Sequence, residues 1–163
     1  MDSNVRIRVR YAESDQMGVA YYSNYLVWFE MARTELLRGR GFPYSKMEED
    51  GFFLPVSECY SKYVLPAHYD ELLEVRCRVG EVRTRAVRFE YKILREGTLL
   101  ARGHTVHVCT DRNARPRTIP SMIREALLEA AGEGPFSGGH RSCPHDSTHT
   151  DAVECDPEGE TSV

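Results

Sequence analysis

Long hydrophobic runs are missing from this sequence of 163 residues. A membrane-spanning helix needs about 20 consecutive apolar residues. No run approaches that length, so we expect no membrane insertion. A secretory signal peptide has a basic region followed by an apolar one, whereas here the alternating run Val5–Tyr11 follows Met1 within a few residues. These absences predict a cytoplasmic location, and the chain length predicts one domain.

The sequence also lacks the cysteine spacings of common metal and redox sites. Its five cysteines form no C-x-x-C pair, which argues against a zinc ribbon or a disulfide-exchange motif. Cys59, Cys77 and Cys109 fall in strand-like runs, where a reduced thiol packs as a small apolar group. The cysteines and histidines of residues 133–163 fit no defined zinc module, so we expect neither a metal nor a cofactor.

Acidic residues gather at the C-terminal end of the chain. Residues 133–163 hold seven acids and one base, a net charge of −6, which leaves +2 on the rest within a total of −4. This segment has too few apolar residues to offset the entropy of ordering. We therefore predict a folded domain over residues 1–132 and a disordered, acidic, polar tail over 133–163. The slight basic excess of the domain suits an anionic ligand, but it is too small to indicate a nucleic-acid partner.

Alternation of apolar and polar residues predicts five strands. The strand-like segments cover residues 5–11, 53–65, 73–79, 87–93 and 98–110. The last four follow one another closely, and short connections imply antiparallel neighbours. The sequence therefore predicts an antiparallel sheet.

Two helices are predicted, over residues 24–38 and 121–131. The first two turns of the long helix leave no polar stripe, since they contain Tyr25, Leu26, Val27, Trp28, Phe29, Met31 and Ala32. A helix that is apolar all round is normally buried, so the sheet must curl around it or a partner subunit must cover it. Glu30 interrupts this apolar part, and we expect it to be ion-paired at an interface, with Arg33 as one candidate.

A carboxylate lies just ahead of the long helix. Asp15 follows the first strand, Gly18 comes next, and Ser23 or Asn24 is the expected N-cap. A helix N-terminus offers backbone N–H groups without intrahelical partners and the positive end of a dipole. The acid offers a general base or a nucleophile. The spacing predicts a reaction centre at Asp15, and a plain turn acid is the alternative.

Three segments resemble the signature of hot-dog-fold acyl-CoA thioesterases. Residues 15–25 read D-x-x-G-x-x-x-Y-x-x-Y, residues 29–33 read F-E-x-A-R, and residues 63–72 read Y-x-x-P-A-x-Y-D-E-L. The resemblance spans residues 5–130. It points to the 4-hydroxybenzoyl-CoA thioesterase branch, which includes the Tol-Pal-associated enzymes.

The resemblance implies an α+β hot-dog fold, in which a five-stranded antiparallel sheet wraps around a long central helix and a short C-terminal helix follows. It also implies a homodimer joined at the sheet edges, or a homotetramer, with active sites at the dimer interface. By the same resemblance Asp15 is the catalytic carboxylate, and the backbone N–H of Tyr22 polarises the thioester carbonyl. Several relatives carry histidine where this chain has Tyr22, so no role that needs an imidazole is carried over.

Thioester hydrolysis needs few protein groups. A thiol with a pKa of about 8.5 leaves as the thiolate without prior protonation, which agrees with the lack of a Ser-His-Asp or Cys-His arrangement near Asp15. Asp15 acts either as a nucleophile that forms a mixed anhydride or as a general base that activates water. The sequence leaves both open.

Four further residues are predicted to bind the acyl-CoA substrate. Gly18 permits a tight loop and close approach of the substrate, and Tyr69 lies in a loop that borders the acyl pocket. Arg83 and Arg85 lie near a strand end, where arginine forks suit the phosphates of coenzyme A. A turn role or a solvated surface position is the alternative for each.

The predicted function is therefore an acyl-CoA thioesterase that releases a free acid and coenzyme A. One alternative is a non-catalytic acyl-CoA-binding or interaction module of the same fold. A hot-dog hydratase or dehydratase is a weaker alternative, because such sites pair a histidine with an acid and no histidine lies near Asp15.

Overall fold

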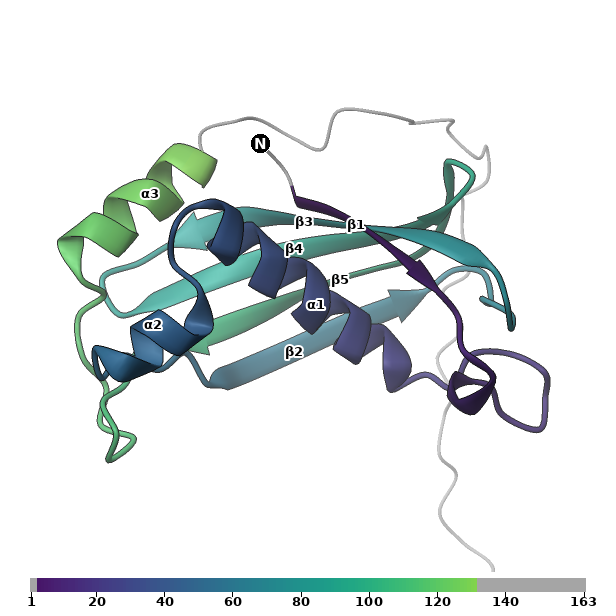
Figure 1. The fold of residues 1–163 in the computed structure, drawn as a ribbon, viewed down its shortest axis with the longest axis horizontal. Coiled ribbons are helices and arrows are strands. Elements are labelled where there is room, and N and C mark those ends of the chain that lie inside the picture. The colour runs from purple at the N-terminus through teal and green to yellow at the C-terminus, as the bar shows by residue number, and fades with distance from the viewer. Residues whose placement is uncertain (1–2, 132–163) are drawn as a thin grey trace, which may run out of the picture.

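Five antiparallel strands form one sheet in the order β1-β3-β4-β5-β2 (Figure 1). The strands are β1 (Ser3–Arg8), β2 (Val56–Tyr63), β3 (Leu72–Val82), β4 (Ala86–Arg95) and β5 (Thr98–Val108). They are seen in a computed structural model that describes residues 3–131. The predicted antiparallel sheet is confirmed, and the alternation read from the sequence matches the buried face of β3 and β4. The predicted acidic tail, 133–163, lies outside the described residues.

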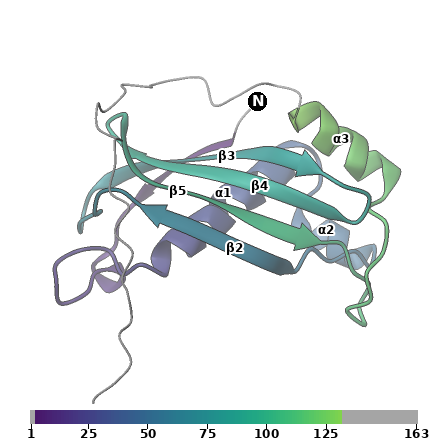
Figure 2. The same ribbon diagram turned by 180° about the vertical axis from the view of Figure 1, so that it is seen from behind.

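The long helix α1 (Asn24–Gly39) crosses one face of the sheet, and the opposite face is seen in Figure 2 with α1 behind it. The core lies between them. Phe29 of α1 stacks on Tyr91 of β4 with ring centroids 4.3 Å apart. A Cβ on Gly103 of β5 would lie 2.7 Å from a Phe29 ring carbon, so glycine at this position lets the helix approach the sheet.

Helix α1 is buried on one side only within a single chain. Its buried residues are Tyr25, Trp28, Phe29, Ala32, Arg33, Leu36 and Leu37. By contrast, Leu26, Val27 and Met31 are 36%, 46% and 41% exposed. Of the two alternatives given for this helix, burial all round by the sheet of one chain is therefore not what the structure shows. The other expectation, that a partner subunit covers part of it, concerns these three residues.

The sheet ends at β2 with an unusually open edge strand. Seven of its eight residues are exposed, including Val56, Tyr60 and Tyr63. Strand β2 is shorter than the predicted segment 53–65, since it begins after Pro55, which has no N–H for a sheet hydrogen bond. A long exposed edge strand is a ready template for pairing with another chain.

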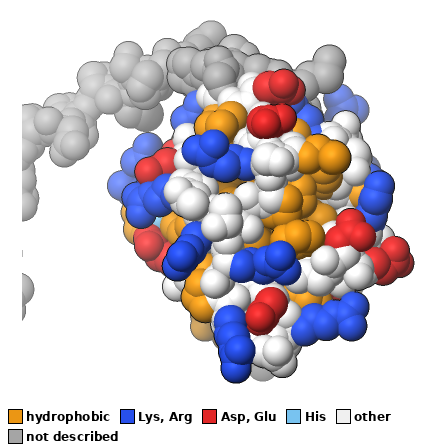
Figure 3. Space-filling view, turned by 90° about the vertical axis from the view of Figure 1, so that its left-hand side faces the viewer, with side chains coloured by type: hydrophobic (Ala, Val, Ile, Leu, Met, Phe, Trp, Pro, Cys, Tyr) orange, Lys and Arg blue, Asp and Glu red, His pale blue; other side chains and the backbone are white. Residues whose placement is uncertain are grey.

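Three smaller helices complete the described chain. Helix α3 (Ser121–Ala131) has the predicted bounds and packs along β3. The 3-10 helix η1 (Tyr11–Glu13) and the short helix α2 (Tyr44–Glu49) are not predicted by the sequence reading. Figure 3 looks onto the end of the molecule where α2 and α3 lie in Figure 1, and apolar side chains gather there inside a ring of charged ones.

The outer sheet face, away from α1, carries a row of like charges. Arg76 of β3 pairs in register with Lys92 of β4, Lys92 pairs with Arg102 of β5, and Arg102 pairs with Lys62 of β2. Arg76 also forms an ion pair with Glu74 at 2.6 Å. Burial and the charges of neighbouring arginines lower the pKa of Lys92. We call these four cations the cationic row.

No helix within residues 3–131 is long and apolar enough to cross a membrane. In the same part of the chain, no group of three or more His, Cys, Asp or Glu side chains is arranged to hold a metal ion.

Candidate active site

The chain leaves β1 through η1 and then forms a tight loop that carries Asp15. Ser14 and Ala20 form an isolated bridge at the base of this loop. The Asp15 carboxylate accepts a hydrogen bond from the Met17 N–H at 2.8 Å, and the Asp15 carbonyl accepts one from Gly18 N–H at 3.0 Å. Such local bonds are typical of an aspartate turn. The loop therefore fixes its own shape while the carboxylate stays half-buried.

Gly18 has a backbone φ of +75°, which other residues rarely adopt. A Cβ built on Gly18 meets no atom within 4 Å, so substitution there is opposed by backbone strain and not by a clash. The turn role weighed in the sequence reading is thus well supported. The predicted contact between Gly18 and substrate stays a prediction.

The main chain just before α1 exposes an N–H group. Tyr21 N–H donates to the Glu13 carbonyl at 2.8 Å, and Asn24 N–H donates to the Tyr21 carbonyl at 3.0 Å. Between them, the Tyr22 N–H donates to no acceptor within residues 3–131. The Tyr22 carbonyl accepts a hydrogen bond from the Tyr63 hydroxyl at 3.1 Å. The Tyr22 peptide is thus held from one side while its donor stays open.

Tyr69 lies close to the Asp15 loop. The Ala20 N–H donates to the Ala67 carbonyl at 2.7 Å, which joins the loop to the segment before β3. The Tyr69 ring packs edge-on against Tyr11 at 5.6 Å, and both rings are exposed, at 55% and 80%. Four predicted site residues, Asp15, Gly18, Tyr22 and Tyr69, therefore share one end of the molecule.

Arg83 and Arg85 lie at the opposite end of the sheet. Strand β3 begins with Leu72, which pairs with Arg8 next to η1, and it ends with Val82 just before the arginines. Its 11 residues rise about 3.3 Å each, so the two ends are roughly 35 Å apart. One chain alone does not bring Asp15 and these arginines together.

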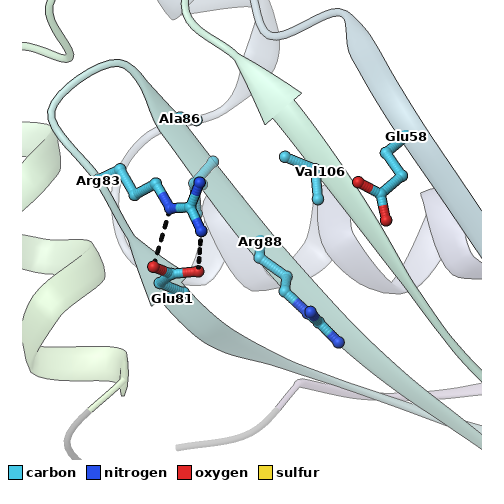
Figure 4. Close-up of a pocket in the computed structure, with 7 residues that line it drawn as sticks. Glu58, Glu81, Arg83, Ala86, Arg88 and Val106 are labelled. Carbon is cyan, nitrogen blue, oxygen red and sulfur yellow. Dashed lines mark hydrogen bonds and ion pairs between the residues drawn. The ribbon is translucent and has the colours of Figure 1, made fainter.

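The arginine end carries a shallow pocket (Figure 4). Arg83 forms two hydrogen bonds with Glu81, at 2.8 and 3.1 Å, and this ion pair raises the pKa of Arg83 and lowers that of Glu81. Arg88 extends from the same face of the sheet. Because Glu81 already occupies Arg83, a phosphate must compete with a carboxylate for that guanidinium.

Glu13 is a site residue that the sequence reading missed. Glu13 is only 5% exposed. Its carboxylate accepts hydrogen bonds from Arg10 N–H at 2.8 Å, from Arg10 Nη2 at 2.9 Å and from Trp28 Nε1 at 3.2 Å. Burial, the largest influence, raises the pKa of Glu13, but the bonds from Arg10 and Trp28 together hold it below its ordinary value. The signal in the sequence was an acid two positions before Asp15.

A second buried polar cluster lies beneath β5. The Arg33 guanidinium contacts the Tyr44 hydroxyl at 2.9 Å and His107 Nε2 at 3.1 Å. Burial is the larger cause, and the Arg33 charge the smaller one, that lowers the pKa of His107 to about 4.

No carboxylate within residues 3–131 forms an ion pair with Arg33. The suggested Glu30–Arg33 pair is therefore wrong for a single chain, because Glu30 is exposed and accepts from Thr34 Oγ1 instead.

The groups near Asp15 include its own carboxylate, the open main-chain donor of Tyr22 and tyrosines, and the adjoining segment adds His68, whose Nδ1 lies 3.2 Å from Glu71 Oε1. His104 and His107, the two histidines of β5, lie on opposite faces of that strand. His104 bonds to Glu58 on the outer face and His107 is buried. Neither is among the contacts of the Asp15 loop. Acyl transfer to water is compatible with this set, because it needs a nucleophile or base and an oxyanion donor.

Comparison with known proteins gives consistent results. Residues 9–127 match the thioesterase-like superfamily. The acyl-CoA thioesterase YbgC of Haemophilus influenzae is 32% identical over 123 residues, which covers 74% of this chain and 90% of the relative.

Two solved structures share the fold. A hypothetical protein from Thermus thermophilus is 45% identical with a TM-score of 0.76, and the match covers 80% of this chain and 98% of that one. A DHNA-CoA thioesterase from Staphylococcus aureus is 31% identical with a TM-score of 0.75, and the match covers 78% and 89%. The hot-dog architecture expected from the sequence is confirmed by these structures.

Proposed function

This chain belongs to the thioesterase-like superfamily, and we propose that it is an acyl-CoA thioesterase that hydrolyses its substrate to a free acid and coenzyme A. Relatives named acyl-CoA thioesterase or thioester hydrolase at 31–32% identity support this activity. Within the superfamily we place the chain in the 4-hydroxybenzoyl-CoA thioesterase branch, near the Tol-Pal-associated enzymes, on the resemblance of residues 15–25.

One observation carries the mechanism. The Asp15 carboxylate and the open Tyr22 N–H belong to one short segment whose two arms are joined by the Ser14–Ala20 bridge. The Tyr22 N–H lies just before α1, where the helix dipole adds positive potential. A preorganised donor of this kind typically lowers the barrier by about 2.7–4 kcal/mol, since it stabilises the oxyanion without reorganisation. The donor is main chain, so tyrosine in place of histidine at position 22 leaves it intact.

Asp15 supplies the other half of the reaction, as nucleophile or as general base. As nucleophile, its carboxylate attacks the thioester carbon and the C–S bond breaks, which gives a mixed anhydride and a thiolate. Water then hydrolyses the anhydride and protonates the thiolate. As general base, it takes a proton from the attacking water. Rapid mixing distinguishes them, because a burst of thiol ahead of free acid requires the anhydride.

We propose that the active unit is a homodimer joined at β2. This strand is exposed along its length, and Leu26, Val27 and Met31 of α1 are exposed apolar side chains in the same chain. Antiparallel pairing of two β2 strands about a twofold axis brings the Asp15 end of one protomer beside the β3–β4 turn of the other. The partner subunit's Arg83 and Arg85 then meet the coenzyme A phosphates, while Gly18 and Tyr69 border the acyl group.

The test is release of free thiol from a panel of aromatic, short-chain and long-chain acyl-CoAs. Wild type is expected to turn over at least one class, and Asp15→Asn is expected to lose nearly all activity. Asparagine keeps the oxygen that accepts the Met17 N–H, so the loop should survive the substitution. Asp15→Asn activity equal to wild type would remove Asp15 from the mechanism. Tight acyl-CoA binding without turnover would instead favour a binding module, and loss of enoyl-CoA absorbance would favour a hydratase.

A further inference from the structure

Glu13 joins the two arms of the Asp15 segment to α1. Its side chain accepts from Arg10 behind it in the sequence and from Trp28 on the helix. Its main-chain carbonyl accepts from Tyr21 N–H at 2.8 Å and from Asn24 Nδ2 at 2.8 Å. A single residue thus receives bonds from Arg10 just before η1, from the returning arm of the loop and from the first and second turns of α1.

The contacts of Glu13 connect the Asp15 loop to α1, which the hydrogen bonds within the loop do not. The bonds within residues 15–19 set the shape of the turn, but they do not set its distance from the start of α1. Glu13 is two residues from Asp15, and its carbonyl is bonded to the N–H of Tyr21, the residue before Tyr22. Moving Glu13 therefore changes the spacing between the carboxylate and the open Tyr22 N–H.

A buried carboxylate is a costly way to obtain that spacing. Glu13 is nearly fully buried, while the Arg10 side chain that pairs with it is 73% exposed. Burying an ionised carboxylate is unfavourable unless hydrogen bonds compensate for its lost hydration. Here the compensating donors are the backbone N–H and the guanidinium of Arg10, the residue before η1, and the Trp28 indole in the core. The carboxylate is consequently held with little freedom at the base of the reactive segment.

We propose that Glu13 is a positioning residue for the thioesterase reaction, and that Trp28 is the core residue through which it fixes the distance between Asp15 and the Tyr22 N–H. This inference rests on the proposed function. Glu13 and Trp28 do not touch substrate; they act through Asp15 and the Tyr22 peptide. A misplacement of about 1 Å at reacting groups can cost roughly 100-fold in rate.

Three variants of the full-length protein test the proposal. Glu13→Gln keeps the shape but turns an amide group toward the donors of Arg10, and we expect kcat to fall about 10- to 100-fold with KM within about threefold of wild type. Trp28→Phe removes one donor and should lower kcat less. The double variant should lose less than the two single losses combined, because both changes act on the same carboxylate.

Tyr91→Phe is the matched control for a merely structural role. Tyr91 is 1% exposed, and its hydroxyl bonds to Thr105 Oγ1 at 2.7 Å in the core beneath α1. We expect it to lower the melting temperature without lowering kcat. If Glu13→Gln keeps the wild-type kcat, or loses no more of it than Tyr91→Phe at equal loss of stability, the proposal is overturned.

A measurement without substrate separates this proposal from the proposed function. The amide resonance and hydrogen-exchange rate of Tyr22, followed by NMR, should change in Glu13→Gln and stay near wild type in Tyr91→Phe. A wild type that hydrolyses no thioester contradicts the proposed function, whereas an unchanged Tyr22 amide in Glu13→Gln overturns the positioning role by itself.

Discussion

The Tyr63 hydroxyl donates a hydrogen bond to the Tyr22 carbonyl at 3.1 Å, and this bond joins the edge strand β2 to the peptide that precedes α1. Tyr63 also packs edge-on against Tyr25 at 4.9 Å. The orientation of the Tyr22 peptide is therefore linked to the strand at which we propose that two protomers meet. In the proposed dimer, assembly and oxyanion binding would share this contact.

Tyr63→Phe tests that link. The variant keeps the ring against Tyr25 and removes the bond to Tyr22, which is expected to cost about 0.5–1.5 kcal/mol in stability. We expect kcat to fall several-fold, because the Tyr22 N–H loses part of its fixed orientation. Tyr60→Phe is the matched control on the same strand, since Tyr60 stacks on His104 instead. Equal kcat values for the two variants would contradict the prediction.

Mixing of two inactive variants tests the shared site. If the partner subunit's Arg83 and Arg85 serve each Asp15, a mixed dimer of Asp15→Asn and Arg83→Ala/Arg85→Ala has one intact site and one doubly defective site. Random exchange of subunits should then restore about a quarter of wild-type activity, counted from the symmetry of a twofold dimer. No recovery after verified subunit exchange would show that the arginines serve Asp15 of their own chain, or neither.

The free energy of unfolding should fall as the pH is lowered from about 6.5 toward 4, because His107 takes up a proton more readily in the unfolded chain. The folded pKa of His107 is lowered to about 4 from 6.5, so in this window the unfolded chain binds a proton that the folded chain excludes. The unfolded state is then favoured, by up to roughly 3 kcal/mol at the low end. Urea unfolding measured from pH 7 to 5 should show this slope before the carboxylates protonate.

His107→Asn provides the comparison for that measurement. The substitution removes the titrating ring and its bonds to Leu54 and Thr105, so the protein should be less stable at pH 7. Its unfolding free energy should nevertheless change less between pH 7 and 5 than that of wild type. A slope as steep as the wild-type slope would assign the pH dependence to other groups.

Deletion of residues 133–163 should leave the fold and the thioesterase rate unchanged. The reason is compositional, since this segment holds a net −6 charge and few apolar residues, and the five strands and α1 are complete without it. Circular dichroism, the melting temperature and kcat/KM of the shortened protein are the measurements. A loss of activity with an intact fold would give the segment a functional role.

Much of the fold was predictable because its longer elements repeat their pattern enough times. Helix α1 was predicted one residue short, and α3 was predicted with its observed bounds. Helix α2 was missed because six residues give too few turns for a periodic signal. The sequence left open whether the sheet or a partner subunit covers the rest of α1, because exposed apolar residues and core residues look the same in a sequence.

The candidate site divides in the same way. Asp15, Gly18 and Tyr22 fall in one continuous segment, so a local motif was sufficient to propose them. Glu13 was missed because its meaning depends on Trp28, 15 positions away and reached only after a loop and a helical turn. The separation of Arg83 and Arg85 from Asp15 could not be predicted from the sequence, because it depends on which end of the sheet the arginines occupy. That position follows from the strand order.

The cationic row makes the stability of this sheet sensitive to dissolved ions. Like charges directly opposite on neighbouring strands repel one another, and the four side chains lie on a face that water reaches. Added salt shortens the range of that repulsion to about 8 Å near 0.15 M, close to two strand spacings. Moderate ionic strength should therefore weaken the repulsion along the cationic row together with the attraction between Arg76 and Glu74.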